Sequence, residues 1–306
     1  MALYISNRQV MTGQTLSPSF VPTLLEAKYG LKHRVFSPPF KFSKLLLDSY
    51  EISNRKDREI KYPVVPTGCV TLVFMLGPHA HGEVMGCNTV LRELVVPPKM
   101  TAYCVRLRAG AFRFFSHIDV SELTDQTVPM GQWVPNLEKL CQPMRYAESF
   151  HERNIILQRF VDKLDGKCFY INEKLQKSID FIKDREGILK IQSLADEVEC
   201  TTRYLSRIFL QHVGVATKMY CQIYQLNASL QSILETRPKS LLDTSITYGY
   251  VDQTHMNRVY RKFLFCTAYE LKNYGLKDMS RIERLMDPDP SMLEFKPPYF
   301  LRATTL

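Results

Sequence analysis

Two segments in the second half of the chain repeat one pattern, and this repeat constrains the fold more than any other feature. The segments are LADEVECTTRYLSRIF at 194–209 and DTSITYGYVDQTHMNRVY at 243–260. They align with Glu199 opposite Gly249 and, after one extra residue in the second turn, with Leu205 opposite Met256. Each copy has the apolar spacing of a short helix, a turn and a second helix. The chain is therefore expected to contain two related helix–turn–helix units.

The second helix of the second copy is amphipathic. Its apolar residues recur at the i, i+3, i+4, i+7 spacing of a packed face: Met256, Val259, Tyr260 and Phe263. The opposite face is rich in hydrogen-bond donors: Thr254, Arg258, Arg261 and Lys262, with Gln253 and His255 at the N-terminal end. Gly249 suits the tight bend before this helix, and Asp252 suits its N-cap. Such a helix fits either a solvated surface or the major groove of DNA.

The duplication helps to decide between a solvated surface helix and a DNA-binding helix. An arginine projects opposite the apolar face one turn into each second helix, Arg207 in the first copy and Arg258 in the second. Two such units joined by one long helix would place two recognition helices about one helical turn of DNA apart, roughly 34 Å. A repeated unit with matched outward arginines favours DNA binding over a merely packed surface.

The first half of the chain has a different texture. From Ile60 onward, β-branched and aromatic runs bounded by Pro and Gly predict short antiparallel strands in a small barrel or sandwich. After Phe112 the pattern turns helical. We therefore expect an α+β multidomain chain with five parts: an irregular N-terminal segment (1–55), a β-rich module (56–134), a helical linker (135–172), an all-α double helix–turn–helix domain (173–277) and an irregular tail (278–306).

Residues 173–275 resemble the AraC/XylS family of transcription regulators, in which two helix–turn–helix motifs are bridged by a central helix. The resemblance rests on SLADEV, YLSRIF, VG at 213–214 and above all GYVDQTHMNRVYRKF. The β-rich part, with PTGCVTLVF, VRLRAGAF and ELTDQTVPM, is similar to the cupin-like barrel module of one branch of that family. The resemblance implies a bacterial, sequence-specific DNA-binding regulator that inserts two recognition helices into successive major grooves under the control of its N-terminal module.

Carried over position by position, the resemblance implies a set of DNA contacts. The first major groove would receive Arg203, Ser206 and Arg207, and the second Gln253, Thr254, His255 and Arg258. Arginine bonds a guanine edge bidentately and glutamine an adenine edge. Arg261 and Lys262 are better placed for phosphate, where they would anchor without specifying sequence. Two alternatives stay open: Arg203 and Arg207 could lie on a solvated face, and His255 could cap its own helix.

The chain also departs from the family pattern at caps and packing positions. Glu199 stands where the family prefers glycine, GVAT at 214–217 replaces Gly-x-Ser-Pro, and Gln225 replaces an arginine of the central helix. Ser245 stands for alanine, and Phe265 and Ala268 stand for a Gly…Pro pair. We expect the fold to survive with altered turns, and Gln225 to loosen a buried salt bridge.

Net charge and cysteine usage indicate the kind of partner and the compartment in which the chain is expected to work. The formal net charge of +9 leans toward polyanionic partners, but the basic excess is not concentrated in the repeated part. The eight cysteines include no C-x-x-C pair, and the first residues do not read as a secretory leader, which favours free thiols in a reducing cytoplasm. No apolar run is long enough to span a membrane. Double-stranded DNA is the expected partner; the resemblance also admits RNA polymerase, a small-molecule effector and a second copy of the chain.

One alternative belongs to another class. The stretch GPHAHGEVMG offers His79, His81 and Glu83 in the β-rich part, and alternation along a strand would point both histidines to one side as metal ligands. A cupin-type metal-binding protein or enzyme is therefore the rival hypothesis. Since Gly77, Pro78 and Gly82 indicate a polar hairpin turn, we expect no metal, no cofactor and no catalytic residues.

Overall fold

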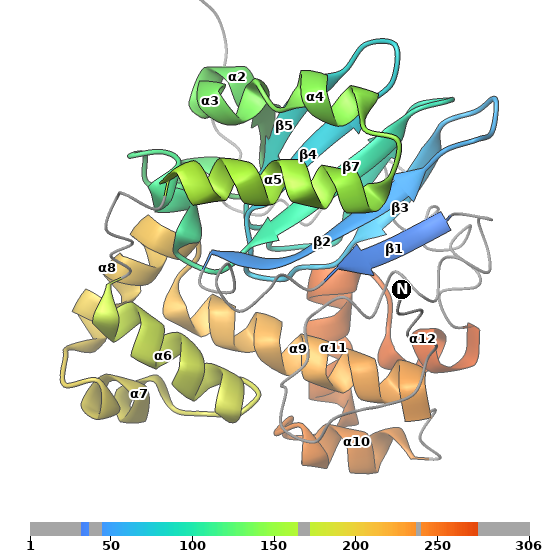
Figure 1. Cartoon of the computed structure of the whole chain (residues 1–306). Helices are drawn as coiled ribbons and strands as arrows, with labels where there is room; N and C mark the ends of the chain where they lie inside the picture. Colours follow the sequence, from blue (N-terminus) through green and yellow to red (C-terminus); the bar gives the residue numbers. More distant parts are fainter. Residues whose placement is uncertain (1–31, 37–44, 165–171, 237–239, 275–306) are drawn as a thin grey trace, which may run out of the picture.

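The computed structural model describes residues 32–36, 45–164, 172–236 and 240–274. In Figure 1 a β-rich module lies above a set of helices. Six antiparallel strands form a sheet in the order β1-β2-β7-β4-β5-β8. They are β1 (Lys32–Phe36), β2 (Leu46–Ser53), β4 (Thr71–Leu76), β5 (His81–Met85), β7 (Thr101–Leu107) and β8 (Thr127–Pro129). Strands β3 (Ile60–Val64) and β6 (Arg92–Val96) pair as a separate antiparallel ribbon.

An antiparallel sheet module followed by a helical domain is thus confirmed, but the closed barrel is not. Within the described strands, β1 and β8 are the two edges of the sheet and do not pair with each other. Side chains of β4 alternate between its faces, as strand geometry requires. Val73 and Met75 pack in the cluster that holds the β3–β6 ribbon, while Leu72 and Phe74 pack toward the helices on the other side.

Strand β2 corrects the expectation that residues 1–55 are irregular; within that range, 32–36 and 46–53 are strands. The signal was hidden because β2 buries polar side chains, which interrupt the apolar alternation. Asp48 is buried because Arg106 Nε donates to its Oδ1 at 2.7 Å, with a second bond from the same guanidinium. Two further polar residues of β2 are held from one helix: Ser49 donates to Asn154, and Glu51 accepts from Arg153.

Helices cover one face of the sheet. They are α2 (Met130–Trp133), α3 (Pro135–Glu138), α4 (Cys141–Tyr146) and α5 (Phe150–Leu164), preceded by the 3₁₀ turns η2 (Ala111–Phe114) and η3 (Val120–Leu123). In Figure 1, α5 runs across the sheet rather than away from it. Leu157 and Val161 pack against Phe74 in one cluster. Much of the segment expected as a linker, 135–172, therefore belongs to the packing of the module; residues 165–171 lie outside the described part, as does the expected tail.

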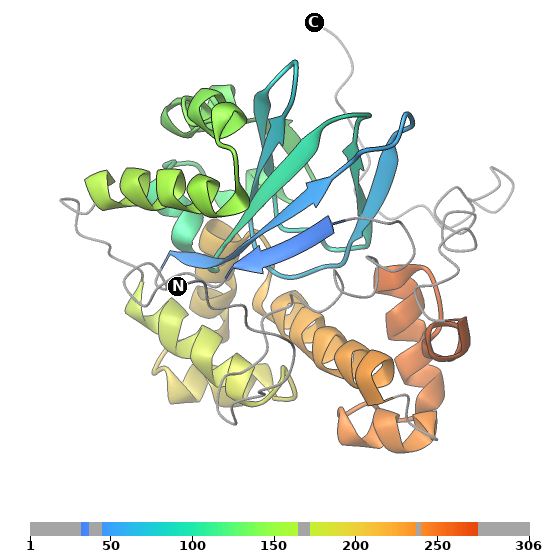
Figure 2. The same ribbon diagram turned by 45° about the vertical axis from the view of Figure 1, so that its right-hand side comes forward.

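The second half is helical, as expected. Its elements are α6 (Glu173–Asp184), α7 (Ile191–Glu197), α8 (Thr202–Val213), α9 (Thr217–Thr236), α10 (Leu241–Thr247), α11 (Gln253–Leu264) and α12 (Ala268–Tyr274). In Figures 1 and 2, α9 runs between two groups, with α6–α8 on one side and α10–α12 on the other. None of the described helices combines the length and apolarity needed to cross a bilayer.

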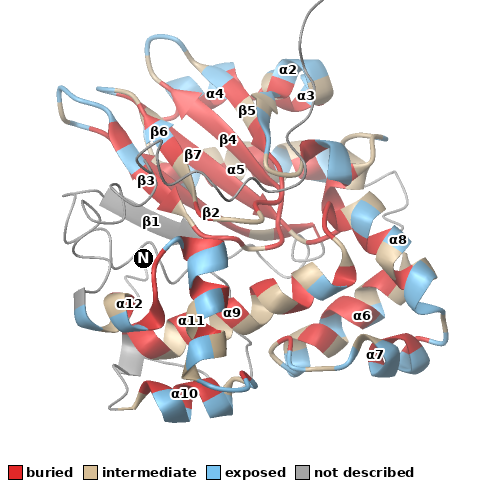
Figure 3. Cartoon of the chain, turned by 180° about the vertical axis from the view of Figure 1, so that it is seen from behind, coloured by how far each residue is buried: buried red, intermediate tan, exposed pale blue. Residues whose placement is uncertain are grey.

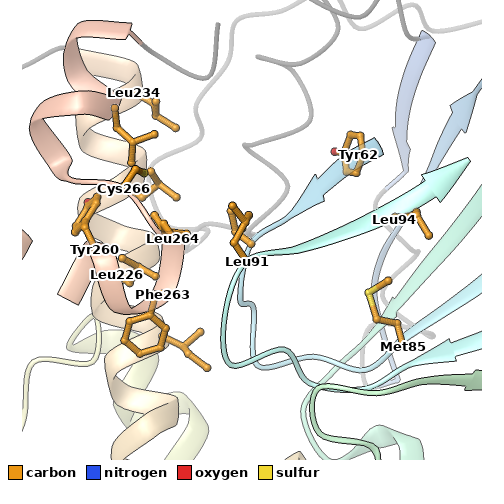
Figure 4. Close-up of a cluster of buried hydrophobic side chains, with 14 of the residues drawn as sticks. Tyr62, Met85, Leu91, Leu94, Leu226, Leu234, Tyr260, Phe263, Leu264 and Cys266 are labelled. Atoms are coloured by element: carbon orange, nitrogen blue, oxygen red, sulfur yellow. The ribbon is translucent and has the colours of Figure 1, made fainter. Parts of the chain in front are cut away.

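The β-rich module packs directly on the helical domain. Figure 4 shows Leu91 between the strands and the side chains of α9 and α11, and its backbone N–H donates to the carbonyl of Phe263 at 2.7 Å. Asn227 of α9 donates to the carbonyl of Pro66 at 2.8 Å. Thr124 donates to the carbonyl of Gly214, after α8, at 2.6 Å. Both helix–turn–helix groups are therefore joined to the module.

Candidate nucleic-acid interface

The repeat seen in the sequence folds into two matching units. Each has a seven-residue first helix, α7 or α10, and a twelve-residue second helix, α8 or α11. The connecting turns are residues 198–201 and 248–252, so the second turn holds the expected extra residue. The alignment therefore marks two structurally equivalent motifs.

Side-chain caps fix where each second helix begins. Thr201 accepts a hydrogen bond from the backbone N–H of Tyr204 at 3.1 Å, and Asp252 accepts one from the N–H of His255 at 2.6 Å. Each cap satisfies a backbone donor that has no partner inside its helix. The expectation that Asp252 is an N-cap is confirmed.

The two turns also share a left-handed residue. Glu199 has φ 51° and its counterpart Gly249 has φ 68°. At Gly249 a Cβ would also lie 2.6 Å from Cγ2 of Ile188, so both backbone and packing require glycine there. Glu199 takes the same conformation without glycine's freedom, which explains why the family prefers glycine at this position.

Helix α8 separates its apolar and polar sides as expected. Leu205, Ile208 and Phe209 are buried. Arg203 and Arg207 are exposed, Ser206 is half-buried, and the Arg207 guanidinium lies 5.2 Å from the centre of the Tyr204 ring. The three candidate residues of the first motif thus lie outside the core, on one helix.

Helix α11 has the same division. Its buried residues are Met256, Val259, Tyr260, Phe263 and Leu264. Thr254, Arg258, Arg261 and Lys262 are exposed, and Gln253 and His255 are half-buried. Within the described part of the chain, no carboxylate forms an ion pair with the exposed arginines of either second helix. Figure 3 shows exposed residues along α8, α10 and α11.

His255 differs from its neighbours on α11. Its Nδ1 lies 3.3 Å from the backbone nitrogen of Val251, which donates to it, and its ring meets the Tyr250 ring edge-on at 5.7 Å. An accepting Nδ1 places the proton of the neutral ring on Nε2. The geometry therefore favours the capping alternative for His255: it holds the turn rather than extending from it.

The departures from the family pattern are accommodated locally. Gln225 of α9 donates to the carbonyl of Tyr248 at 2.8 Å, so an amide joins the central helix to the second turn where the family has an arginine. Ser245 is fully buried and donates to the carbonyl of Leu242 at 2.7 Å. Phe265 ends α11 in the left-handed region, φ 59°, where the family has glycine.

The histidines of the rival hypothesis lie in a hairpin. Strands β4 and β5 pair directly, and residues 77–80 form the turn between them. His81 bonds the carbonyl of His79 through Nδ1 at 2.9 Å, and its Nε2 lies 3.5 Å from Glu83 Oε1. The described residues contain no group of three or more His, Cys, Asp or Glu side chains placed to hold a metal ion. Their seven cysteines are all free thiols.

Comparison with known families agrees with this geometry. Residues 194–273 match the description "Helix-turn-helix domain". The chain carries an AraC-type helix–turn–helix domain. This match identifies residues 194–273 as a DNA-binding domain of a transcription regulator. Residues 35–129 match a domain of unknown function, DUF6597. No curated protein matches the chain.

Solved structures with a similar arrangement include ToxT from Vibrio cholerae. One, bound to (E)-4-(8-methylnaphthalen-1-yl)but-3-enoic acid, is 9% identical with a TM-score of 0.38, over 83% of this chain and 99% of that one. Another, with unsaturated fatty acid bound, is 12% identical with a TM-score of 0.36, over 78% and 94% of the two chains. A likeness this remote transfers neither ligands nor residue roles.

Proposed function

We propose that this protein is a sequence-specific transcription regulator that inserts α8 and α11 into successive major grooves of DNA. The observation that carries the proposal is the pair of equal helix–turn–helix units on either side of α9. Since α9 has 20 residues, it is about 30 Å long. That length is close to one helical turn of DNA, the separation that two successive major grooves require.

The exposed side chains divide into two roles. Arg207 and Arg258, at matched positions of the two helices, read base edges, and guanine is the base that arginine bonds bidentately. Arg203 and Ser206 assist in the first groove, and Gln253 and Thr254 in the second, near the helix N-termini. Arg261 and Lys262, in the last turn of α11, contact phosphate and set affinity rather than sequence preference. His255 positions the turn.

We propose a regulatory role for the β-rich module. Its contacts reach both motifs, because Thr124 bonds the chain after α8 and Leu91 bonds the end of α11. A change in the module therefore acts on the spacing of the recognition helices. The partners whose binding could produce such a change are a small-molecule effector, a second copy of the chain and RNA polymerase. We propose that the protein works in the cytoplasm and has no enzymatic activity.

The test uses the full-length chain. Duplexes that it retains from a random-sequence pool give a selected duplex, and its shuffled sequence gives the control duplex. Arg258→Ala should cost about 1–3 kcal/mol on the selected duplex and relax preference at one base pair. Arg145→Ala, at an exposed arginine of α4 in the β-rich module, should change nothing.

Two outcomes contradict the proposal. If the wild-type chain retains no duplex, or binds with an affinity that does not fall as salt rises, it is not a DNA-binding regulator, because phosphate contacts release counterions. If Arg258→Ala weakens the selected and shuffled duplexes equally, α11 does not read sequence.

A further inference from the structure

Helix α9 has one face that the β-rich module covers and an opposite face that it does not. Tyr220 and Asn227 lie on the covered face: a Cβ on Gly68 would be 2.5 Å from the Tyr220 ring, and Asn227 bonds the carbonyl of Pro66. With 3.6 residues per turn, Lys218 and Gln222 lie about half a turn away from Tyr220. Lys218 is exposed and Gln222 half-buried.

Lys262 of α11 reaches this uncovered face. Its Nζ lies 3.4 Å from Oε1 of Gln222, to which it donates. Gln222 lies one helical turn from Lys218 on α9, so the Lys262 ammonium that it binds lies near the Lys218 side chain. Burial and, secondarily, the ammonium group of Lys218 lower the pKa of Lys262. No carboxylate of the described chain forms an ion pair with either lysine. Two like charges from different helices thus lie on the same surface.

The position of the two lysines relative to α8 and α11 suggests what they bind. Lys218 is the second residue of α9, which follows α8 after a connection of three residues, 214–216. Lys262 lies on α11 itself. Lys218 therefore lies next to the end of α8, and Lys262 lies on α11 where that helix contacts the uncovered face of α9. If two successive major grooves receive α8 and α11, the sugar–phosphate backbone that separates the grooves passes between these helices.

We infer that Lys218 and Lys262 form a clamp for the DNA backbone between the two grooves, with Gln222 holding the Lys262 ammonium in place. The inference rests on the proposed function and extends it to Lys218 and Gln222 of α9, outside the two recognition helices. A phosphate placed between the two ammonium groups would convert their mutual repulsion into two attractive contacts. Such a contact fixes the position of the duplex and carries no sequence information.

The experiment measures the dissociation constant of the full-length chain for the selected and shuffled duplexes at several salt concentrations. Lys218→Ala should weaken both duplexes by the same factor and reduce the slope of log affinity against log salt by about one. Lys218→Gln, which removes the charge but keeps a polar side chain, should do the same. Lys218→Arg should keep the wild-type slope.

Lys139→Ala is the matched control. Lys139 is an exposed lysine that donates to Asn136 at 3.1 Å beside α3, on the far side of the sheet. Its loss removes the same charge from the chain and should leave the slope unchanged. This control separates a local phosphate contact from the general effect of net charge.

The outcomes keep the two proposals apart. If the wild-type chain binds no DNA, the proposed function fails and the clamp fails with it. If the wild type binds and Arg258→Ala relaxes its sequence preference, but Lys218→Ala and Lys218→Gln leave the salt slope unchanged, the clamp alone is wrong. A Lys218→Ala variant that weakens the selected duplex much more than the shuffled one would also overturn it, since Lys218 would then contact a base.

Discussion

The two helix–turn–helix motifs have the same helix lengths but are joined to the β-rich module in different ways. The first ends at Gly214, φ 95°, where a Cβ would lie 2.8 Å from Oγ1 of Thr124 in the module. The second ends at Phe265, which has a left-handed φ of 59°. The Phe265 side chain is 37% exposed, so it points away from a close contact. The first motif therefore needs glycine for close approach, and the second does not.

The buried support of the motifs differs as well. Under α8 the contacts are apolar and aromatic, with the Phe209 and Tyr220 rings edge to face at 5.3 Å. Under α11 a hydroxyl network is present: Ser229 of α9 lies 3.1 Å from the Tyr250 hydroxyl and 2.9 Å from that of Tyr260. Burial raises the pKa of Tyr250 to about 12. Similar apolar patterns thus give helices of equal length, while each motif packs on different tertiary partners.

The largest effect should come from removing one core ring from each motif. Phe209→Ala and Phe263→Ala delete side chains that are fully buried, so each should lower the free energy of unfolding by about 3–5 kcal/mol. Urea unfolding of both variants measures the loss. If one variant lost less than about 1 kcal/mol, its motif would not be packed on α9 as described.

Gly214→Ala should be the next most damaging. It forces a side chain into the left-handed region and against Thr124, at a cost of about 2–4 kcal/mol. Gly131→Ala is the control, because a Cβ there would meet nothing closer than 3.6 Å and the residue is helical. Equal stability losses for the two variants would contradict the close approach of α8 to the module.

Ser229→Ala should destabilise the second motif alone. The buried hydroxyls of Tyr250 and Tyr260 would each lose a partner, at a cost of about 1–3 kcal/mol. Thermal unfolding followed by circular dichroism measures the loss of stability. A neutral result would mean that the network contributes no net stability.

The smallest effect is a gain. Glu199→Gly should stabilise the chain by about 1 kcal/mol, because glycine takes φ 51° without the cost that a Cβ brings. Glu197→Gly makes the same chemical change at an exposed helical residue and should instead cost about 0.5–1 kcal/mol. If both variants changed the free energy of unfolding in the same direction, the first turn would not resemble the second.

Local patterns in the sequence predicted the two motifs well. Features that depend on contacts between residues far apart in the sequence could not be predicted in this way. The period of α11, the Asp252 cap and the extra turn residue all depend on neighbours within a few positions. Strand β2 was missed because Asp48 is buried by Arg106, far along the chain. The interaction of Lys218 with Lys262 has the same origin: each looks like an ordinary surface lysine until the fold brings the two helices together.

The most direct test of two-groove binding is base-removal interference on the selected duplex with the full-length chain. Two clusters of essential bases are expected, with their centres about 10 bp apart. Arg207→Ala should remove dependence on a base in one cluster, and Arg258→Ala on a base in the other. A single cluster, or two variants that change the same cluster, would contradict the claim that α8 and α11 each read a major groove.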